Sequence, residues 1–179
     1  MKLGPTAIQD CFEVLGTCFE DNRGTFTKIY QKTVFSRAGV DFDFEEVFFS
    51  SSKRHVIRGL HFQLPPHDHA KIVTCISGYA LDVIVDLRKG SATYGETASF
   101  SLRQGEGRGL LIPRGCAHGF CSLEDNTVIA YFVSSEHSRS HDSGIHWTSA
   151  AITWPTKDPN VSARDALLPH LSDFESPFP

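Results

Sequence analysis

The sequence predicts an all-β protein, a two-sheet jelly roll or barrel with only a few short helices. Short segments rich in β-branched and aromatic residues follow one another and are separated by Gly, Pro and Asp. Segment 79–87 shows the clearest strand pattern, because its odd-numbered positions from 81 onward are all Leu or Val, while Asp82 and Asp86 occupy even-numbered ones. Many short strands of this kind are typical of antiparallel sheets that close into sandwiches or barrels.

The remaining elements follow from the same signals. We expect strands at residues 46–52, 55–63, 71–77, 79–87, 98–102, 108–112, 119–122 and 127–134. Helix is predicted only at residues 28–37 and as a short turn that begins at Ser162. We expect the tail 175–179 either to be loose or to pack as an extended arm.

Length and composition limit the class of protein. A chain of 179 residues, 40% of them hydrophobic, is long enough to form one domain over residues 1–179 with a full core. The net charge of −4 and the lack of a Lys/Arg run argue against a nucleic-acid or membrane-surface partner. The five cysteines are odd in number and lack paired C-x-x-C spacing, which favours reduced thiols and a cytoplasmic location. No run of about 18 apolar residues is present to cross a membrane.

Two segments place charged side chains on predicted strands, where burial is costly unless the charge has a function. The first, RGLHFQ, begins at Arg58 and is followed by Lys71; the second, IPRGCAHGF, carries His118. Strict alternation would place Arg58 and His61 on opposite faces, so both can reach one cavity only if a bulge at Gly59 bends the strand. A lone His is usually a satisfied core residue, but two such segments favour a functional site at the mouth of a barrel.

Together with further motifs, these segments resemble the dTDP-4-dehydrorhamnose 3,5-epimerase family. The further motifs are Asp21-x-Arg23-Gly24-x-Phe26, the stretch from Asp82 to Gly95, Ile145-x-Trp147, Ile152-x-Trp154-Pro155 and Ser162-x-x-Asp165. The resemblance covers nearly the whole chain. It implies a cupin-type double-stranded β-helix and an isomerase that epimerises a nucleoside diphosphate 4-keto-6-deoxyhexose, as in dTDP-rhamnose and polysaccharide biosynthesis. It also implies a homodimer that exchanges its N-terminal part, and chemistry without a cofactor.

The resemblance also implies a role for each site residue. His61 would be the base, oriented by Asp165, and Tyr131 would return the proton from the other face. Lys71 would stabilise the enolate. Substrate-binding roles fall to His118, Gln63 and Phe26, and to Arg23 and Arg58 as a clamp on the diphosphate, with Arg23 supplied by the neighbouring subunit.

Two departures from the family pattern lie where the nucleotide base should bind. Glu46 stands where the family usually has Gln, and His137 stands where it commonly has Tyr. A carboxylate accepts hydrogen bonds but does not donate them, so Glu46 suits the amino group of cytosine better than the ring of thymine. A dTDP-linked substrate is expected first, and a CDP-linked one remains an alternative.

Three other functions stay open at this stage. The enzyme could act at C3 or C5 only. A metal-dependent cupin enzyme is suggested by His67-x-His69 together with His118, although Val73 and Thr74 occupy the place of the expected Glu, and we expect no metal. A non-catalytic sugar-binding module on the same scaffold would not need His61, Asp165 and Tyr131 together.

Overall fold

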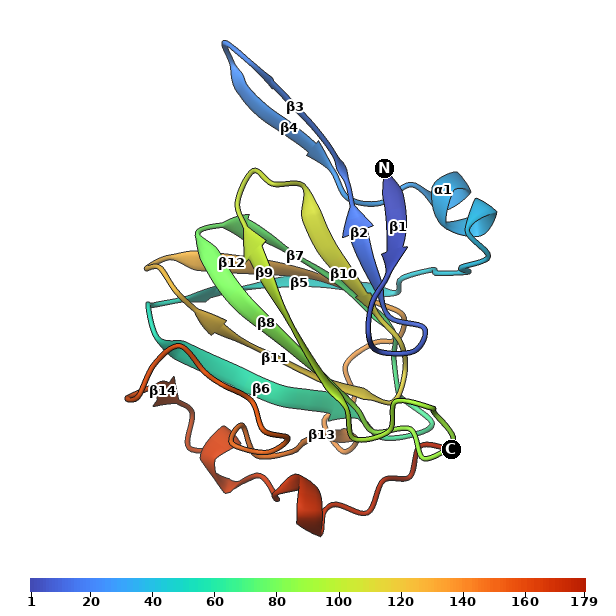
Figure 1. Ribbon diagram of the computed structural model, residues 1–179, viewed down its shortest axis with the longest axis vertical. Coiled ribbons are helices and arrows are strands. Elements are labelled where there is room, and N and C mark those ends of the chain that lie inside the picture. Colours follow the sequence, from blue (N-terminus) through green and yellow to red (C-terminus); the bar gives the residue numbers. More distant parts are fainter.

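Two antiparallel β-sheets packed face to face form the body of the protein, in the computed structural model of residues 1–179 (Figure 1). The strand order of the first sheet is β1 (Lys2–Pro5), β2 (Phe12–Leu15), β10 (Arg108–Ile112), β7 (Lys71–Ser77), β12 (Thr127–Val133) and β5 (Glu46–Ser52). The order of the second is β13 (Asp142–Gly144), β6 (Val56–Gln63), β11 (Cys116–Ser122), β8 (Tyr79–Asp86) and β9 (Thr97–Arg103), with β14 (Asn160–Val161) added parallel to β6. The predicted all-β jelly-roll fold is therefore confirmed.

The central strands lie where the sequence predicts them. Strands β5, β7 and β10 have the predicted bounds, while β11 begins at Cys116, earlier than predicted. The helix expected at 28–37 is wrong in its first part, because Lys28 ends a strand and α1 spans only Lys32–Arg37. The turn at Ser162 leads into the short 3-10 helix η1 (Asp165–Leu167), and a second one, η2 (Leu171–Asp173), was not predicted.

The main core lies between the two sheets and follows the alternation read from β8. Ala80 and Ile84 point inward into a cluster with Phe120, Ile129 and other apolar side chains. The opposite face of the same strand carries residues 83, 85 and 87, which pack against the last part of the chain. Both faces of the second sheet are therefore buried.

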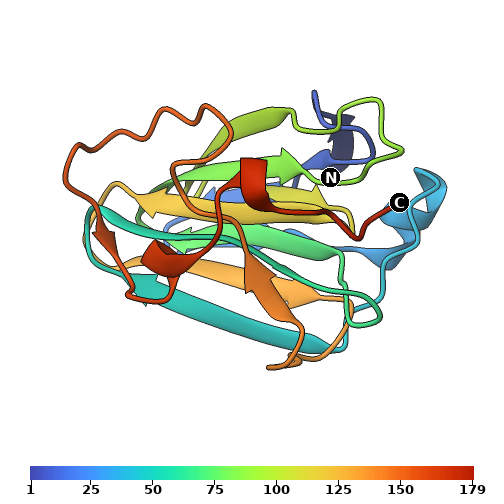
Figure 2. The same cartoon turned by 90° about the horizontal axis from the view of Figure 1, so that it is seen from below.

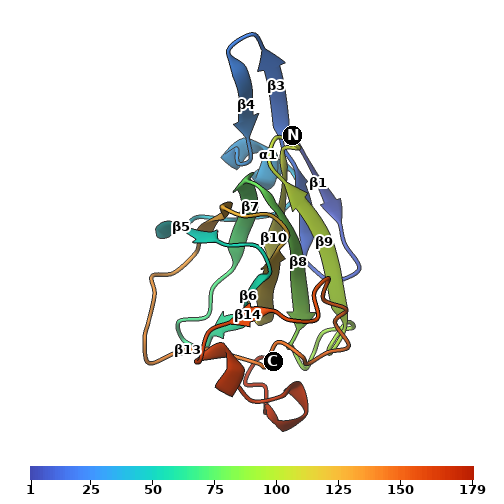
Figure 3. The ribbon, with the colours of Figure 1, turned by 90° about the vertical axis from the view of Figure 1, so that its left-hand side faces the viewer.

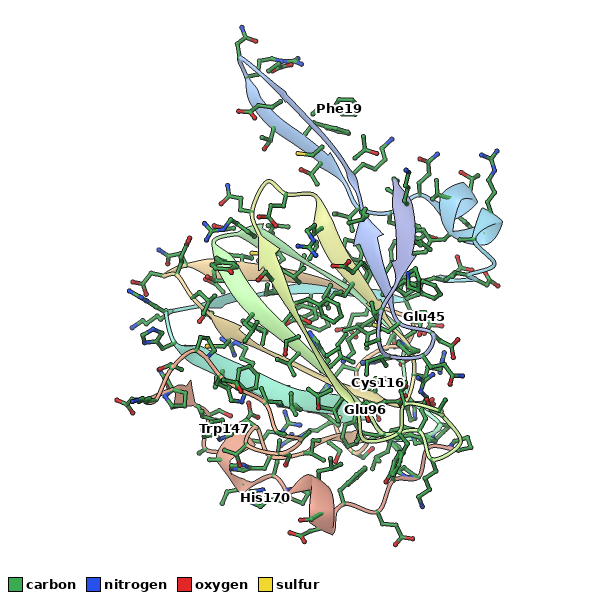
Figure 4. All side chains as sticks on the ribbon, viewed as in Figure 1. Phe19, Glu45, Glu96, Cys116, Trp147 and His170 are labelled. Atoms are coloured by element: carbon green, nitrogen blue, oxygen red, sulfur yellow. The ribbon has the colours of Figure 1, made fainter.

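The C-terminal segment covers the outer face of the second sheet, as seen from below in Figure 2. Phe178 is 3% exposed, and Ser176 donates a hydrogen bond to the Leu87 carbonyl. Of the two states expected for the tail, the packed arm is the one observed. In Figure 4, Trp147 and His170 lie on this C-terminal part, on the side of the second sheet.

The hairpin of β3 (Thr17–Asp21) and β4 (Gly24–Lys28) projects away from both sheets (Figures 1 and 3). Its two phenylalanines, Phe19 and Phe26, are 63% and 58% exposed, with ring centroids 6.4 Å apart. Figure 4 shows Phe19 on the hairpin, well away from the body of the protein. The hairpin therefore makes no core of its own within this chain.

The five cysteines are all free thiols, as the sequence analysis expected. Four of them are buried, and only Cys18 on β3 is exposed. No helix is both long and apolar enough to span a membrane.

A bulge between β6 and β11 bends β6 at the predicted position. His118 pairs with His61, and Phe120 pairs with Arg58, so two residues of β6 oppose Gly119 alone. Gly59 has a φ of +132°, and a Cβ placed on it would lie 2.6 Å from the Gly119 Cα. Only glycine fits this conformation and this close backbone approach.

We expect Gly59→Ala to lower the free energy of unfolding by at least about 2 kcal/mol, because an added methyl group forces β6 and β11 apart. Denaturant unfolding of the wild type and the variant measures this difference.

Gly95→Ala is the matched control, because Gly95 also has a positive φ, +79°, but an added Cβ meets nothing within 4 Å. Its cost should be limited to the backbone conformation, about 1–2 kcal/mol. Equal losses in the two variants would contradict a steric role for Gly59.

Candidate active site

A cavity of about 530 Å³ opens between the two sheets and collects most of the predicted site residues. Those that line it are Glu46, Arg58, His61, Gln63, Lys71, His118, Tyr131, His137 and Asp165. Arg58 and His61 both reach this cavity, as the bulge at Gly59 allows. Arg23 and Phe26 do not line it, because they lie on the projecting hairpin.

His61 forms a hydrogen-bonded pair with Asp165, which stands at the start of η1. The His61 Nε2 to Asp165 Oδ1 distance is 2.8 Å, and the Gly59 amide donates to Asp165 Oδ2 at 3.3 Å. Burial acts to raise the pKa of Asp165, but the hydrogen bond and charge of His61 and the Gly59 amide together hold it below its usual value. Asp165 is therefore an anion that accepts a hydrogen bond from Nε2–H, which leaves the lone pair of His61 on Nδ1.

Hydrogen bonds within the turn at residues 162–166 position the Asp165 carboxylate. The Asp165 amide donates to Ser162 Oγ at 3.0 Å, and the Ala166 amide donates to the Ser162 carbonyl. Ser162 and Asp165 thus form the short turn expected at Ser162, and this turn directs the Asp165 side chain toward His61.

Tyr131 faces the cavity from the other sheet. It lies on β12, whereas His61 lies on β6, so the imidazole and the phenol reach the cavity from opposing sheets. Burial raises the pKa of Tyr131, and the nearby Ser50 hydroxyl acts in the opposite direction without reaching full hydrogen-bond geometry. The phenol is protonated at neutral pH and can serve as a proton donor.

Lys71 brings a buried ammonium group into the cavity. Its side chain is on β7, the residue is 6% exposed, and Nζ lies 3.5 Å from the His61 carbonyl oxygen. Burial lowers the pKa of Lys71 to about 8, although the charge of Asp82 opposes the change. Such a weakly solvated ammonium interacts strongly with any negative charge that develops beside it.

His118 is held by a buried carboxylate. Its Nε2 lies 2.8 Å from Asp82 Oδ2, and both side chains are almost fully buried. Burial lowers the pKa of His118, with Asp82 acting against the change, so the ring is neutral and donates from Nε2. The second oxygen of Asp82, Oδ1, is buried without a hydrogen-bond partner within the chain.

The two arginines of the expected diphosphate clamp lie far apart within one chain. Arg58 donates to Ser52 Oγ at 3.0 Å and to the Ser51 carbonyl at 3.1 Å, which holds the guanidinium at the cavity. Arg23 is 85% exposed on the hairpin and pairs only with Asp21, at 2.6 Å. Within this chain, only Arg58 of the two arginines lines the cavity.

The side-chain amide of Gln63 forms hydrogen bonds with the loops that border the cavity. Its Oε1 accepts from the Ser138 amide at 2.6 Å, and its Nε2 donates to the His67 carbonyl at 2.8 Å and lies 3.1 Å from His69 Nδ1. These contacts tie two loops together at the edge of the cavity.

Glu46 and His137 are also joined to each other. The His137 amide donates to Glu46 Oε2 at 2.7 Å, and both residues line the cavity. One carboxylate oxygen of Glu46 is thereby used by the protein, and no hydrogen bond to Oε1 is formed within the chain.

Several cavity residues were not predicted as site residues. Arg164 and Asp142 form an ion pair of 2.9 Å at the cavity wall, and Phe48 and Ser50 line it from β5. The signal for Arg164 was its position beside Asp165, and the signal for Phe48 and Ser50 was their alternation with Glu46 along one strand.

The His67-x-His69 motif does not form a cluster of metal-ligand type. His69 lines the cavity with Nδ1 next to the Gln63 amide, whereas the His67 ring is exposed and lies 4.4 Å from the His141 ring. Burial, with the charge of Lys71, lowers the pKa of His69 to about 3. No group of three or more His, Cys, Asp or Glu side chains converges in an arrangement that could hold a metal ion.

The sequence model of the dTDP-4-dehydrorhamnose 3,5-epimerase family matches residues 5–173 of this chain. The chain belongs to this family. A 3,5-epimerase of Mycobacterium tuberculosis (strain CDC 1551 / Oshkosh) is 38% identical to this chain in an alignment of 183 positions, gaps included, that covers 98% of this chain and 90% of that protein. A dTDP-4-dehydrorhamnose 3-epimerase of Streptomyces niveus is 36% identical in an alignment of 173 positions that covers 94% of this chain and 84% of that protein.

The fold agrees with this family membership. The crystal structure of the 3,5-epimerase of Bacillus anthracis, with TDP and PPi bound, matches this structure with a TM-score of 0.91 and 39% identity. The match covers 95% of this chain and 99% of that one. This family member is thus a carbohydrate epimerase of the cupin-type jelly-roll fold, and the resemblance read from its motifs is confirmed.

The low pKa of Lys71 predicts an alkaline limit to epimerase activity. The ammonium is charged below about pH 8 and neutral above it, so the enolate stabilisation expected of Lys71 should be lost as the pH rises through this value. We expect kcat/KM of the wild type to fall about tenfold per pH unit above this point. Lys71→Met should be about 10²- to 10³-fold less active at neutral pH, and its kcat/KM should not show the alkaline fall. Initial rates across the pH range measure both effects.

Lys89→Met is the control, because Lys89 is exposed and lies outside the cavity. It should keep the wild-type pH profile. An unchanged alkaline fall in Lys71→Met would assign the titration to another group.

Proposed function

We propose that the chain is a 3,5-epimerase of a nucleoside diphosphate 4-keto-6-deoxyhexose that moves protons beside the C4 ketone without a cofactor. The observation that carries this proposal is the placement of a base and an acid on opposing sheets. The His61–Asp165 pair lies on one side of the cavity, and the protonated phenol of Tyr131 lies on the other. Inversion of a carbon needs a proton removed from one face and another delivered to the opposite face.

The proposed chemistry starts at His61. Nε2–H is engaged by Asp165, so Nδ1 accepts the proton from the carbon next to the ketone, and the carboxylate stabilises the imidazolium that forms. The electrons of the broken C–H bond pass to the ketone oxygen, where the Lys71 ammonium stabilises the enolate. Tyr131 then delivers its proton to the other face of the carbon, and exchange with water restores both groups.

The substrate class follows from Arg58 at the cavity and from the relatives. Arg58 supplies a fixed guanidinium for a diphosphate oxygen. The relatives are named for dTDP-linked substrates, and the Bacillus anthracis enzyme was solved with TDP. We therefore assign a nucleotide sugar with a thymine base as the first substrate to test, in a pathway that builds an activated deoxysugar such as dTDP-L-rhamnose.

We also propose a homodimer in which the β3–β4 hairpin completes the partner's cavity. The hairpin projects from its own chain and carries the exposed Phe19, Phe26 and Arg23 (Figure 3). Exposed aromatic side chains next to an exposed guanidinium suit a surface that is covered by a second subunit and its nucleotide. This arrangement would bring Arg23 toward Arg58 and Phe26 toward the base.

A mono-epimerase is the second candidate. The Streptomyces niveus relative named as a 3-epimerase is 36% identical to this chain, close to the 38% of the Mycobacterium tuberculosis 3,5-epimerase. Overall identity therefore does not separate inversion of one carbon from inversion of two. The difference depends on how the sugar ring and the Tyr131 phenol meet in the cavity.

Hydrogen exchange in deuterated water tests the proposal. With dTDP-4-keto-6-deoxyglucose as substrate, proton NMR should show loss of both the C3 and the C5 signals. His61→Ala and Tyr131→Phe should each lower turnover by about 10²-fold or more while dTDP affinity changes little, because each removes a proton-transfer group rather than a binding group.

The control is His67→Ala, which removes an exposed imidazole outside the cavity and should leave exchange at the wild-type rate. Exchange at one carbon only would favour a mono-epimerase. No exchange with dTDP- or CDP-linked sugars, despite tight nucleotide binding, would identify a non-catalytic binding module.

The hydrogen bonding of Glu46 predicts which nucleotide base, thymine or cytosine, the enzyme prefers. One carboxylate oxygen is held by the His137 amide, and the other is available only as an acceptor. We expect Glu46→Gln to shift the ratio of kcat/KM for dTDP- over CDP-linked substrate by about 3- to 10-fold toward dTDP, the size of one hydrogen bond. Steady-state kinetics with both substrates measures the ratio.

The exposed Glu45, labelled in Figure 4, gives the control variant Glu45→Gln, because it neighbours Glu46 and lies outside the cavity. Its ratio should equal that of the wild type. An unchanged ratio in Glu46→Gln would remove the argument for a CDP-linked substrate.

A further inference from the structure

Phe48 lies directly across the β5–β12 ladder from Tyr131. The two residues are register partners in the antiparallel pair, and their rings stack with centroids 4.6 Å apart and planes 12° from parallel. Directly opposed aromatic side chains on neighbouring strands restrict each other's rotation, and such a pair contributes about 0.5–1.5 kcal/mol beyond its buried area.

A second ring limits Tyr131 from the β11 side. The His118 ring lies edge-on to the phenol ring, with centroids 6.0 Å apart and planes at 71°. His118 is itself fixed by its 2.8 Å contact with Asp82. The phenol ring thus has one neighbour that is anchored by a buried carboxylate and another, Phe48, that is anchored only by its own strand.

Phe48 does not form part of the apolar core. The residue is 42% exposed at the cavity, and it belongs to none of the apolar clusters that form the core. Its neighbours on the same face of β5 are Glu46 and Ser50, both polar. Phe49, next along the chain, is 73% exposed, lies outside the cavity and stacks on no other ring.

We propose that Phe48 is a positioning residue that fixes the direction of the Tyr131 O–H, and thereby sets how proton return is divided between C3 and C5. This inference rests on the proposed role of Tyr131 as the acid. C3 and C5 flank the same ketone, so a modest swing of the whole phenol about χ1, which a stacked neighbour restricts, moves its oxygen from one carbon toward the other. Displacements of this size are enough to alter proton transfer strongly.

The test compares Phe48→Ala with Phe48→Tyr, by proton NMR in deuterated water and by steady-state kinetics. Phe48→Ala should lower kcat about 3- to 10-fold, leave KM within about twofold, and change the ratio of C3 to C5 exchange rates at least about threefold. Phe48→Tyr keeps a stacked ring and should restore the wild-type ratio. A purely structural role would lower both exchange rates equally and leave their ratio unchanged.

Phe49→Ala is the matched control, since it removes the same side chain from the other face of the same strand. If Phe48→Ala fails to fold, Phe48→Leu keeps apolar bulk without the ring, and it should show the same change in ratio. If the Phe48 variants match Phe49→Ala in rate and ratio while Tyr131→Phe is inactive, this inference is wrong and the proposed function stands. If Tyr131→Phe keeps its turnover, the assigned role of Tyr131 is itself wrong.

Discussion

The close approach of β6 to β11 at Gly59 is the constraint on which the site depends. The bulge there turns Arg58 and His61, three positions apart, toward one cavity, which a regular strand would not allow. The amide of the same glycine donates to Asp165 at 3.3 Å. One backbone irregularity therefore places His61, Asp165 and Arg58 in a common space.

The titratable groups around that space have different protonation states at neutral pH, because each lies in a different environment. Asp165 is buried, but His61 and the Gly59 amide keep it ionised, whereas burial of Tyr131 keeps the phenol protonated. Lys71 remains an ammonium up to about pH 8, with Asp82 as the nearby compensating charge. This pattern suits a reaction that needs a base, an acid and a cation within one cavity at neutral pH.

The sequence predicted the central strands well and the margins of the fold poorly. Strands such as β8 carry alternation over eight residues, and both of their faces are buried, so the pattern is strong. The short strands β1, β2, β13 and β14 have only two to four residues each and were missed, because pairing with distant strands defines them rather than local pattern. The start of α1 was misplaced because Lys28 is used by the β3–β4 hairpin.

The sequence by itself determined the family, the fold class and which residues are candidates for the site, since these follow from residue types at short fixed spacings. Only the tertiary structure decided which of them meet. His61 and Asp165 are separated by 104 positions, and Glu46 and His137 by 91. The Phe48–Tyr131 stack exists because of the register between β5 and β12. Such contacts depend on how distant strands align, and that alignment is set by packing of the whole core rather than by any local pattern.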